Sequence, residues 1–588
     1  MLAGQLVYAA LTNDPGGMLM NVGALPRRHR RARWVGALAA VAAVALVAGA
    51  CQTSESSTSD TSQTPGTFTA SDVNEDAGPP QSGGLLAFGL ASETDGWSPQ
   101  NSRWGGSGYI VGFSIFDPLA AYGEDGEVHP YLASAFDHNP DFTEWTIGVR
   151  PGVSFHDGTP VDAEAIAANL RANKASPLTG TVFEFADDFI PSADGTEVTV
   201  PMNKPWSTFP EVLTAQTGVV AAPSMATDPE AAANPVGSGP FIFESWEQNN
   251  ELKVRKNPEY WRSGLPYLDN IEFRVVSDNQ ARSSSFESGS IDIFESGDAG
   301  QILDYTQRAE QDDTLQMFTT PQAEGSKIFI ALNMAQPPFD DPIAREAVAY
   351  ALDTAALSEQ AFEGIFPPVD GVFSKNSPYY APDHGAPQLD QERARQRAQE
   401  YEAKYGKPLT FTTNVLTTPE SQLIGQVIQA QLRDVGIEVS VQSKEAATII
   451  ADTVLGNYES TGFILFGSPG LDREYVFFAG PAKPIGSLSL NFTRIPDDQN
   501  QAVRDAMDMA RTTEDPVVKK EQYAIVQEEM AKNLNLLFLV QMTSALVFTE
   551  DVNGVLRWNL PDASGGEGPA GQPTTAPFTA NIWMSQRG

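Results

Sequence analysis

The stretch 235–241 reads Pro-Val-Gly-Ser-Gly-Pro-Phe, and its last residue opens a predicted strand at 241–246. The Gly-Ser-Gly-Pro part has the composition of a packed turn and also that of a backbone nest that binds an anion. Short apolar strands like this one alternate along the chain with amphipathic helices, a pattern typical of mixed or parallel sheets with helices outside them. Further strands are predicted at 85–90, 145–149, 197–200, 271–276, 327–333, 409–413, 437–442 and 462–466. We therefore expect an α/β protein.

Several predicted helices carry clear signals at their ends. Asp341-Pro342 and Asp515-Pro516 each place an acidic N-cap before a proline at the first helical position, where the missing N–H costs nothing. The segment 419–435 repeats apolar residues four apart, and Gly436 supplies a left-handed stop after it. A further segment, 390–405, is charged almost all round, so we expect it to lie exposed.

The single cysteine, Cys51, ends an apolar run that follows a basic cluster. The run covers 35–50, and the basic residues before it are Arg27, Arg28, Arg30, Arg31 and Arg33. This order is typical of a bacterial secretion signal, and a thiol directly after the cleaved bond resembles the lipobox of lipoproteins. We therefore expect a signal peptide at 1–50 and lipid on Cys51. The alternative is an uncleaved anchor, although the 16 apolar residues fall short of the ~20 that span a bilayer.

Residues 51–82 follow this signal and are rich in Ser, Thr, Asp, Gly and Pro. A segment with so little to bury is expected to be a disordered tether. Two acyl chains on Cys51 would hold it stably, whereas one chain binds a membrane only reversibly. The folded body is then expected to begin near Gly83 and to work at the outer face of the cytoplasmic membrane, on the cell surface or in the periplasmic space.

Charge and size restrict the possible partners. The 588-residue chain has a net charge of −38, which becomes −42 when the residues before Cys51 are removed. Such an acidic surface repels nucleic acid and anionic headgroups, so we expect neither as a partner. Roughly 500 residues follow the tether, which is enough for two or three lobes. With Cys51 committed to lipid no disulfide is expected, and we predict a monomer stabilised by its cores alone.

Ordered motifs along the body resemble one known family. A first block joins Ile115-Phe116-Asp117-Pro118-Leu119 to residues 150–160, which read Arg-Pro-Gly-Val-Ser-Phe-His-Asp-Gly-Thr-Pro. A second block runs from 235–241 through Asn257-Pro258-Glu259-Tyr260-Trp261 to 288–292, and a third covers 332–353. In order and spacing these blocks resemble the extracellular solute-binding proteins of ABC importers, in the family of oligopeptide-, dipeptide- and nickel-binding members known as family 5.

This resemblance implies a fold like that of the type II periplasmic binding proteins, with two lobes, a hinge and an extra inserted domain. We place lobe I at 83–116, 238–320 and 535–588, the inserted lobe II at 117–237, and lobe III at 321–534. The stretch 237–240 is then a turn beside the hinge. Ligand would be enclosed between lobes and would stabilise the closed state by its differential affinity for that state. The closed form would dock on a membrane permease.

Ligand-binding candidates come from both sides of the expected cleft. Loops at the carboxyl ends of strands ring the crevice of such a fold, which points to Glu93, Trp97 and Trp104. Both tryptophans offer broad apolar surfaces, and packing inside a lobe is the alternative for each. Across the cleft we place Asn333, Asp472 and Arg473.

Asp472 is the most specific of these candidates, because peptide-binding members of the family have near this position an acidic residue that pairs with the peptide amino group. A charge-assisted hydrogen bond of this kind contributes about 1.5–3 kcal/mol. The alternative is that Asp472 caps a helix at Glu474.

Catalytic signatures are scarce. The chain has no Walker-type phosphate loop, no His-Glu-x-x-His, no Cys-x-x-Cys and no calcium-type loop, so we expect no metal and no cofactor. His156 lies in a predicted turn, and Gly105-Gly106-Ser107-Gly108 is expected to be a loop or a helix start, not a hydrolase nucleophile. We predict no enzyme but a lipid-anchored receptor that delivers a peptide or peptide-like solute to an ABC importer. The alternatives are a surface protein that senses or adheres, and an extracellular hydrolase on the same fold.

Overall fold

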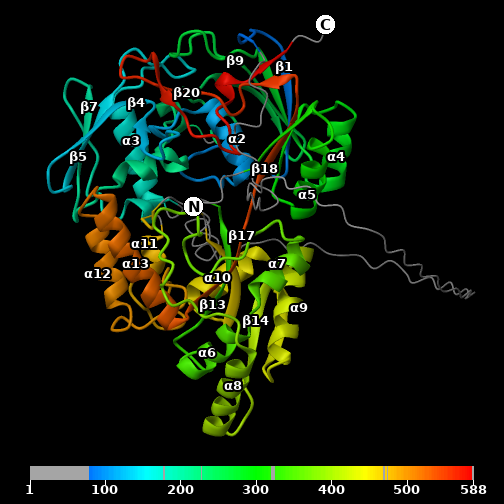
Figure 1. The fold of residues 1–588 in the computed structure, drawn as a ribbon. Helices are drawn as coiled ribbons and strands as arrows, with labels where there is room; N and C mark the ends of the chain where they lie inside the picture. The colour runs from blue at the N-terminus through cyan, green and yellow to red at the C-terminus, as the bar shows by residue number, and fades with distance from the viewer. Residues whose placement is uncertain are drawn as a thin grey trace, which may run out of the picture. The chain divides into compact units, whose positions relative to one another are not determined.

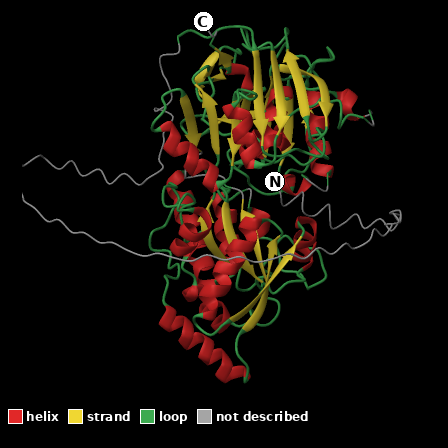
Figure 2. Cartoon of the chain, turned by 90° about the vertical axis from the view of Figure 1, so that its right-hand side faces the viewer, coloured by secondary structure: helices red, strands yellow, loops and turns green. Residues whose placement is uncertain are grey.

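The computed structural model describes residues 78–585, except 177–178, 227, 229, 320–324, 466, 468–469 and 473. Three sheets of four or more strands organise this part of the chain (Figure 1). Helices lie against the strands in the view of Figure 2 as well, so the predicted α/β class is confirmed. The predicted signal peptide, Cys51 and most of the predicted tether lie outside the described residues.

The largest sheet has seven strands in the order β12-β18-β11-β1-β10-β9-β8. Its central strand β1 pairs in parallel with β10 and β11, and the other pairs are antiparallel. The strands are β1 (Leu85–Leu90), β8 (Phe241–Glu247), β9 (Glu251–Lys256), β10 (Asn270–Val275), β11 (Ile293–Ser296), β12 (Leu315–Thr319) and β18 (Ala545–Thr549). The same parts of the chain contribute the helices α2 (Gly106–Ile115), α4 (Asn279–Glu287) and α5 (Ala299–Ala309).

A second sheet has five strands in the order β15-β14-β16-β13-β17. These are β13 (Lys327–Leu332), β14 (Thr410–Leu416), β15 (Glu438–Lys444), β16 (Ser460–Leu465) and β17 (Leu536–Gln541). The helices in this part of the chain are α6 (Pro342–Ala351), α7 (Thr354–Phe362), α8 (Gln391–Tyr405), α9 (Pro419–Arg433), α10 (Ala446–Leu455), α11 (Tyr475–Phe478), α12 (Gln501–Ala510) and α13 (Pro516–Asn533).

A third, antiparallel sheet has the order β4-β5-β7-β6 and is formed by residues between β1 and β8 of the chain. It contains β4 (Ala133–His138), β5 (Glu144–Val149), β6 (Ile190–Pro191) and β7 (Glu197–Pro201), with α3 (Ala163–Ala175) beside it. Three short pairs complete the strands: β2 (Ala120–Tyr122) with β3 (Val128–Pro130), β20 (Asn559–Pro561) with β21 (Glu567–Ala570), and β19 (Val552–Asn553) with β22 (Trp583–Met584). Short 3₁₀ turns cover 180–183, 209–214, 216–218, 223–226 and 579–581.

Two short connections join the seven-stranded sheet to the five-stranded sheet. One leads from β12 to β13, and the other leads from β17 to β18 (Figure 1). They lie together, because Met542 N donates to the Ser326 carbonyl at 2.7 Å and a Cβ at Gly325 would lie 2.6 Å from Met542 O. The chain therefore crosses between the two sheets twice, and the two crossings meet at Ser326 and Met542.

Motifs that are far apart in the sequence meet at Asp117, whose side chain is 1% exposed. Its Oδ1 accepts a hydrogen bond from Tyr260 OH at 2.9 Å, while Oδ2 accepts from Trp261 Nε1 at 2.9 Å and from Ser238 Oγ at 3.1 Å. Burial raises the pKa of Asp117 to about 6, although these three hydrogen bonds oppose the rise. The hydrogen bonds of Asp117 thus join this residue, which precedes β2, to Ser238, before β8, and to Tyr260 and Trp261, between β9 and β10.

The stretch 237–240 packs against the end of α2. A Cβ at Gly237 would overlap the Ile115 carbonyl oxygen, and a Cβ at Gly239 would lie 2.5 Å from the Ile115 carbonyl carbon. His156 Nε2 donates a hydrogen bond to the Gly239 carbonyl at 2.9 Å. Only glycine allows this close backbone approach, so the contacts favour the packed turn over the anion nest.

The helix signals in the sequence are confirmed. Asp341 and Asp515 accept hydrogen bonds from the backbone N–H groups of Ile343 and Val517, and proline follows each as the first residue of its helix. Gly436 has a φ of +87°, the left-handed value expected after α9. The expectation that 390–405 lies exposed all round is wrong for one face: α8 buries Ala394, Ala398 and Tyr401, because this face packs on α6.

Candidate functional site

A cavity of about 520 Å³ is lined by both large sheets and by the segment that holds the third sheet. Small-molecule sites have volumes of about 300–1,000 Å³, so the cavity is large enough to hold a ligand. Trp104 and Tyr109 reach it from the start of α2, Thr214 from the third-sheet segment, and Phe329 and Phe463 from β13 and β16. A solute in this cavity would contact all three parts of the chain.

One wall of the cavity is a continuous array of aromatic rings beside the seven-stranded sheet. The Phe113 and Phe578 rings stack with centroids 5.3 Å apart, and Phe578 stacks on Trp558 at 4.3 Å. Tyr109 continues the array, with centroid distances of 5.5 Å to Phe113 and 6.2 Å to Trp104. Rings packed against one another in this way form a stiff apolar surface.

A second part of the lining, beside the five-stranded sheet, is also aromatic. Phe329 and Phe463 have centroids 6.1 Å apart, Phe463 and Phe492 are 5.2 Å apart, and Phe492 and Phe477 are 5.0 Å apart. Among the described lining residues, Glu474 is the one carboxylate, and none is Lys, Arg or His. Hydroxyl and amide groups of Ser, Thr, Tyr and Gln supply the other polar side chains of the lining.

Of the residues predicted beside the first strand, Trp104 lines this cavity and Trp97 and Glu93 do not. Trp104 is held in place by its Nε1, which donates to the Gly96 carbonyl at 3.2 Å. Trp97 is 2% exposed and packs on Trp104 and Trp246, the core alternative foreseen for it. Glu93 accepts a hydrogen bond from Trp246 Nε1 at 2.7 Å, so it supports this packing.

Asn333 does not line the cavity either, because its side chain is fully buried and its amide is used locally. Nδ2 donates to the carbonyls of Gly456 and Tyr458 at 3.0 and 2.8 Å, and Oδ1 accepts from Ala335 N at 3.1 Å. Asn333 therefore ties β13 to the loop before β16, and it has no donor left for a ligand.

Asp472 lies in a buried ion pair, not in the cavity lining. Its side chain and that of Arg511 are each 4% exposed; Arg511 Nε donates to Asp472 Oδ1, and Trp206 Nε1 donates to Oδ2 at 3.1 Å. The predicted pairing with a ligand amino group does not fit this environment, because the carboxylate is already compensated. The Asp472 carboxylate does not cap α11 either, because no side-chain hydrogen bond caps this helix, whose N-cap residue is Glu474. Arg473 and Cys51, the remaining predicted residues, lie outside the described residues.

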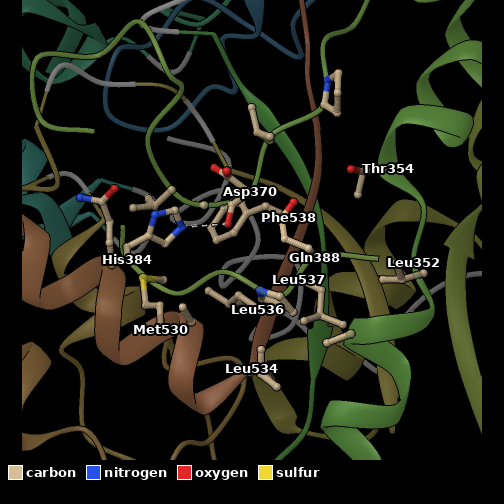
Figure 3. A pocket seen from close by; sticks show the side chains of 18 of the residues that line it. Leu352, Thr354, Asp370, His384, Gln388, Met530, Leu534, Leu536, Leu537 and Phe538 are labelled. Atoms are coloured by element: carbon tan, nitrogen blue, oxygen red, sulfur yellow. Dashed lines mark hydrogen bonds between the residues drawn. The ribbon is translucent and has the colours of Figure 1, made fainter. Parts of the chain in front are cut away.

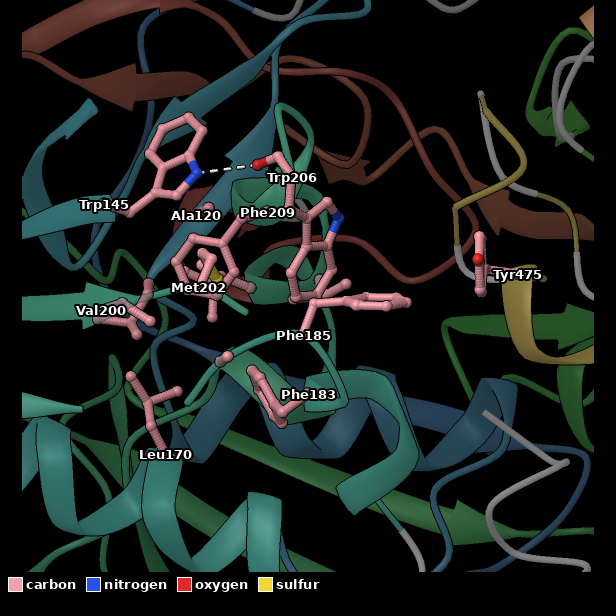
Figure 4. Close-up of a cluster of buried hydrophobic side chains, with 14 of the residues drawn as sticks. Ala120, Trp145, Leu170, Phe183, Phe185, Val200, Met202, Trp206, Phe209 and Tyr475 are labelled. Carbon is pink, nitrogen blue, oxygen red and sulfur yellow. Dashed lines mark hydrogen bonds between the residues drawn. The ribbon is translucent and has the colours of Figure 1, made fainter. Parts of the chain in front are cut away.

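The Arg511 guanidinium is the centre of a contact between the third-sheet segment and α12. It lies over the rings of Tyr475 at 4.0 Å and of Phe185 at 4.2 Å. Phe185 also meets Tyr475 edge-on at 5.1 Å (Figure 4). Ser207 adds two hydrogen bonds, from its N to the Arg511 carbonyl at 2.8 Å and from its Oγ to the Thr513 carbonyl at 2.7 Å. We call this set of residues the Arg511 contact.

A second cavity, of about 300 Å³, lies beside β17 and between α7 and α13 (Figure 3). Its polar groups are used in local structure: His384 Nδ1 contacts the Ala381 carbonyl at 2.6 Å, Asp370 accepts from Tyr380 OH at 2.9 Å, and Asp353 caps α7. Its lining comes from the part of the chain that holds the five-stranded sheet, so a molecule here would not bridge the two large sheets.

Other chemistry considered from the sequence finds little support in the described part of the chain. The stretch 105–108 begins α2, and Ser107 Oγ donates a hydrogen bond to the Glu295 carboxylate at the start of this helix. His156 is occupied by the Gly239 carbonyl, and burial lowers its pKa to about 4. In the described residues no three His, Cys, Asp or Glu side chains gather as a metal site would require. No described helix has both the length and the apolar character to cross a bilayer.

Solved structures with the same fold are periplasmic binding proteins. The PBP AgaA of A. tumefaciens R10, in complex with agropinic acid, matches 86% of this chain and 99% of its own length with a TM-score of 0.70 and 24% identity. DppA of Helicobacter pylori, in complex with the peptide STSA, matches 86% and 99% with a TM-score of 0.70 and 20% identity. At these identities the likeness concerns the fold, and it confirms the periplasmic-binding-protein fold that is expected from the motifs.

Sequence comparison defines the family. Residues 127–475 match the sequence model of the bacterial extracellular solute-binding proteins, family 5 Middle. The glutathione-binding protein GsiB of Pectobacterium atrosepticum is 30% identical over 365 residues, which cover 60% of this chain and 68% of that protein. The chain therefore belongs to family 5 of the bacterial extracellular solute-binding proteins. The relatives found are named as binding proteins, not as enzymes.

Most of the aromatic lining was missed by sequence reasoning. Phe463 lies in the predicted strand 462–466, and Phe477 lies in the run that was searched for an acidic partner of the ligand. The aromatic character of these two residues was the one signal in the sequence that could have placed them in the cavity lining. Phe578 and Trp558 lie in a segment without a period of two or 3.6 residues, which leaves no pattern to assign them to a wall. Their role depends on contacts across the chain, from residue 113 to residue 578.

Proposed function

We propose that this chain is a lipid-anchored receptor at the outer face of the cytoplasmic membrane, which delivers a solute to an ABC importer. The observation that carries the proposal is the cavity, whose walls come from both large sheets. A solute bound there contacts both sheets. It therefore stabilises the closed arrangement to the extent that it binds this arrangement more tightly than the open one. A peptide or peptide-like solute is the proposed class, because GsiB is named for glutathione and DppA was solved with a peptide.

The proposed lobes are 83–116, 238–320 and 535–588 for lobe I, 117–237 for lobe II, and 321–534 for lobe III. Because β17 pairs with β13, the part of 535–588 before residue 542 packs with lobe III in this arrangement. The hinge is proposed at the two connections between the large sheets. If lobe II moves with lobe I, the Arg511 contact breaks on opening and re-forms on closure.

A thermal-shift screen of the purified chain tests the binding role. Peptides, sugars, siderophores and nickel chelates are each added in large excess. A ligand at one hundred times its dissociation constant adds about 2.7 kcal/mol to the free energy of unfolding, which a melting curve detects. We expect a shift with one class, peptides, whereas no shift with any class would contradict a receptor role.

Spin labels on the two sides of the hinge test closure. Cys51 is the single cysteine, so a Cys51→Ser background leaves Glu259→Cys and Glu402→Cys as the labelled pair, and both positions are exposed. The distance between the labels should shorten when the ligand found in the screen is added. A control pair has both labels inside lobe III, at Glu402 and Glu420. The distance between these two labels should not change when the ligand is added.

A further inference from the structure

We infer, on the basis of the proposed function, that the part of the solute that enters the cavity between the two large sheets is hydrophobic. Aromatic rings of the lining would select it by contact with its side chains. The solute class is then a short peptide or peptide-like amide with aromatic or branched aliphatic side chains. The rings that carry this preference come from both sides of the hinge, so a hydrophobic solute would contact both lobes that close on it.

Beside the seven-stranded sheet, the lining contains two tryptophans whose polar atoms are bonded within the protein. Trp104 Nε1 donates to the Gly96 carbonyl at 3.2 Å, and Trp558 Nε1 donates to the Gln572 carbonyl at 3.2 Å. Phe578, whose side chain has no polar atom, stacks on Trp558 with ring centroids 4.3 Å apart. These three side chains therefore offer a solute the apolar carbon surface of their rings.

Beside the five-stranded sheet, the strand register brings two phenylalanines to the same face. Phe329 of β13 and Phe463 of β16 are direct partners in the antiparallel register, and their ring centroids lie 6.1 Å apart. Phe492 packs on Phe463 at 5.2 Å and on Phe477 of α11 at 5.0 Å. All four rings line the cavity, so strands and helix together present a second apolar surface.

Phe463 and Phe477 differ from their neighbours because they are only half-buried. A fully buried ring such as Phe329, at 3% exposed, is accounted for by packing inside the protein. A half-buried ring in a cavity lining keeps part of its apolar surface in water. An apolar group of the solute removes that surface from water, with a gain that grows with the area covered. We therefore assign Phe463 and Phe477 as residues that determine specificity.

Calorimetric titration of the purified chain with two matched tripeptides tests the preference. Phe-Leu-Phe and Ser-Ala-Ser have the same backbone length, the same free termini and the same net charge, so their affinities differ through their side chains. We expect Phe-Leu-Phe to bind at least about 100-fold more tightly, because its two benzyl groups and its isobutyl group leave water on binding. Equal affinity, or tighter binding of Ser-Ala-Ser, would overturn the inference and leave the receptor role intact.

Serine substitutions at the two half-buried rings test the assigned residues. Phe463→Ser and Phe477→Ser each remove apolar surface from the lining, so each should weaken the binding of Phe-Leu-Phe by about 10-fold or more. Val517→Ser is the control, because this side chain is 63% exposed on α13 and lies outside the described lining. Unchanged affinity in both phenylalanine variants would contradict the assignment. Melting curves show whether each variant is folded, and the two tripeptides on the native chain decide the question if one is not.

A wrong preference and a wrong role give different results. If Phe-Leu-Phe does not bind but another solute of the thermal-shift screen does, the hydrophobic preference is wrong and the receptor role stands. If neither tripeptide binds and no solute of the screen does, the proposed receptor role itself fails.

Discussion

Arg511 shows how a single buried charge holds two parts of the chain together. Its guanidinium is 4% exposed, lies between the rings of Phe185 and Tyr475, and pairs with Asp472. Two charges in such a place cost desolvation energy, and the pair recovers it only while both partners are present. At the residue scale, the Arg511 contact is therefore sensitive to the loss of either partner.

Replacing Arg511 by Met should lower the free energy of unfolding by about 3–5 kcal/mol, because the buried Asp472 carboxylate loses its partner. The double variant Arg511→Met with Asp472→Leu should be more stable than this single variant, since no charge is then left uncompensated. Urea unfolding measures both values. The control Lys532→Ala, at a side chain 72% exposed, should change stability by less than about 0.5 kcal/mol. An Arg511→Met variant as stable as this control would contradict the assignment.

His156 should make stability depend on pH. Burial lowers its pKa from 6.5 to about 4 in the folded chain, so between these values the unfolded chain binds a proton that the folded chain does not. Stability is therefore full above pH 6.5 and falls as the pH drops toward 4. From pH 7 to pH 5 this group alone should remove about 2 kcal/mol, at 1.36 kcal/mol per pKa unit.

The variant His156→Gln isolates this effect from other groups. Asp117, whose pKa is raised to about 6, acts in the opposite sense and is unchanged in the variant. The loss of stability between pH 7 and pH 5, measured by urea unfolding, should be smaller in His156→Gln than in the native chain by about 2 kcal/mol. Equal losses in the two proteins would show that His156 does not titrate in the folded chain as described.

At the scale of elements, close backbone packing decides where the strands and helices meet. Gly237 touches the end of α2 so closely that any Cβ would overlap the Ile115 carbonyl. Gly105, at the other end of the same helix, has nothing within 4 Å of its Cβ position and a φ of −87°. Two glycines that look alike in the sequence therefore tolerate substitution very differently.

Gly237→Ala should destabilise the chain by about 1–3 kcal/mol, the usual cost of an extra carbon in a packed place, whereas Gly105→Ala should leave its stability nearly unchanged. Melting temperatures of the two variants, measured side by side, give the comparison. Equal melting temperatures of the two variants would contradict the interpretation of 237–240 as a packed turn.

Local patterns in the sequence predicted the elements with regular periods and good end signals. Nine strands and the helices after Asp341 and Asp515 were found because apolar alternation and capping are local. The order of strands was not predictable, since β18 enters the sheet between β12 and β11 from residues far along the chain. The partners of Asp472 were not predictable for the same reason: Arg511 lies 39 residues away and Trp206 lies 266 residues away.

At the scale of the whole molecule, the proposed role requires an anchor, a hinge and an enclosed solute. Lipid on Cys51 would attach the body to the membrane while leaving its lobes free to move. The two connections beside Ser326 and Met542 would act as the hinge. The acidic surface, at a net charge of −38 for the whole chain, agrees with a ligand that is not strongly anionic.

Cys51→Ser should release the protein from the membrane fraction if lipid is the anchor. In detergent phase separation, the native chain should enter the detergent phase and the variant the aqueous phase, with Ser54→Ala as a control that behaves like the native chain. If Cys51→Ser remains in the membrane fraction, the apolar run 35–50 is an uncleaved anchor and the lipoprotein assignment is wrong.

Native mass spectrometry of the gently purified chain tests whether the cavity between the two large sheets holds a solute. The native chain should carry a co-purified apolar solute that is lost on unfolding. The variant Ala576→Trp, which fills the cavity from a half-buried lining position, should carry none, while its melting behaviour shows that it is folded. A bound mass is expected in the native chain alone. The same bound mass in both proteins would place the solute elsewhere, and would contradict the assignment of the cavity between the two sheets as the binding site.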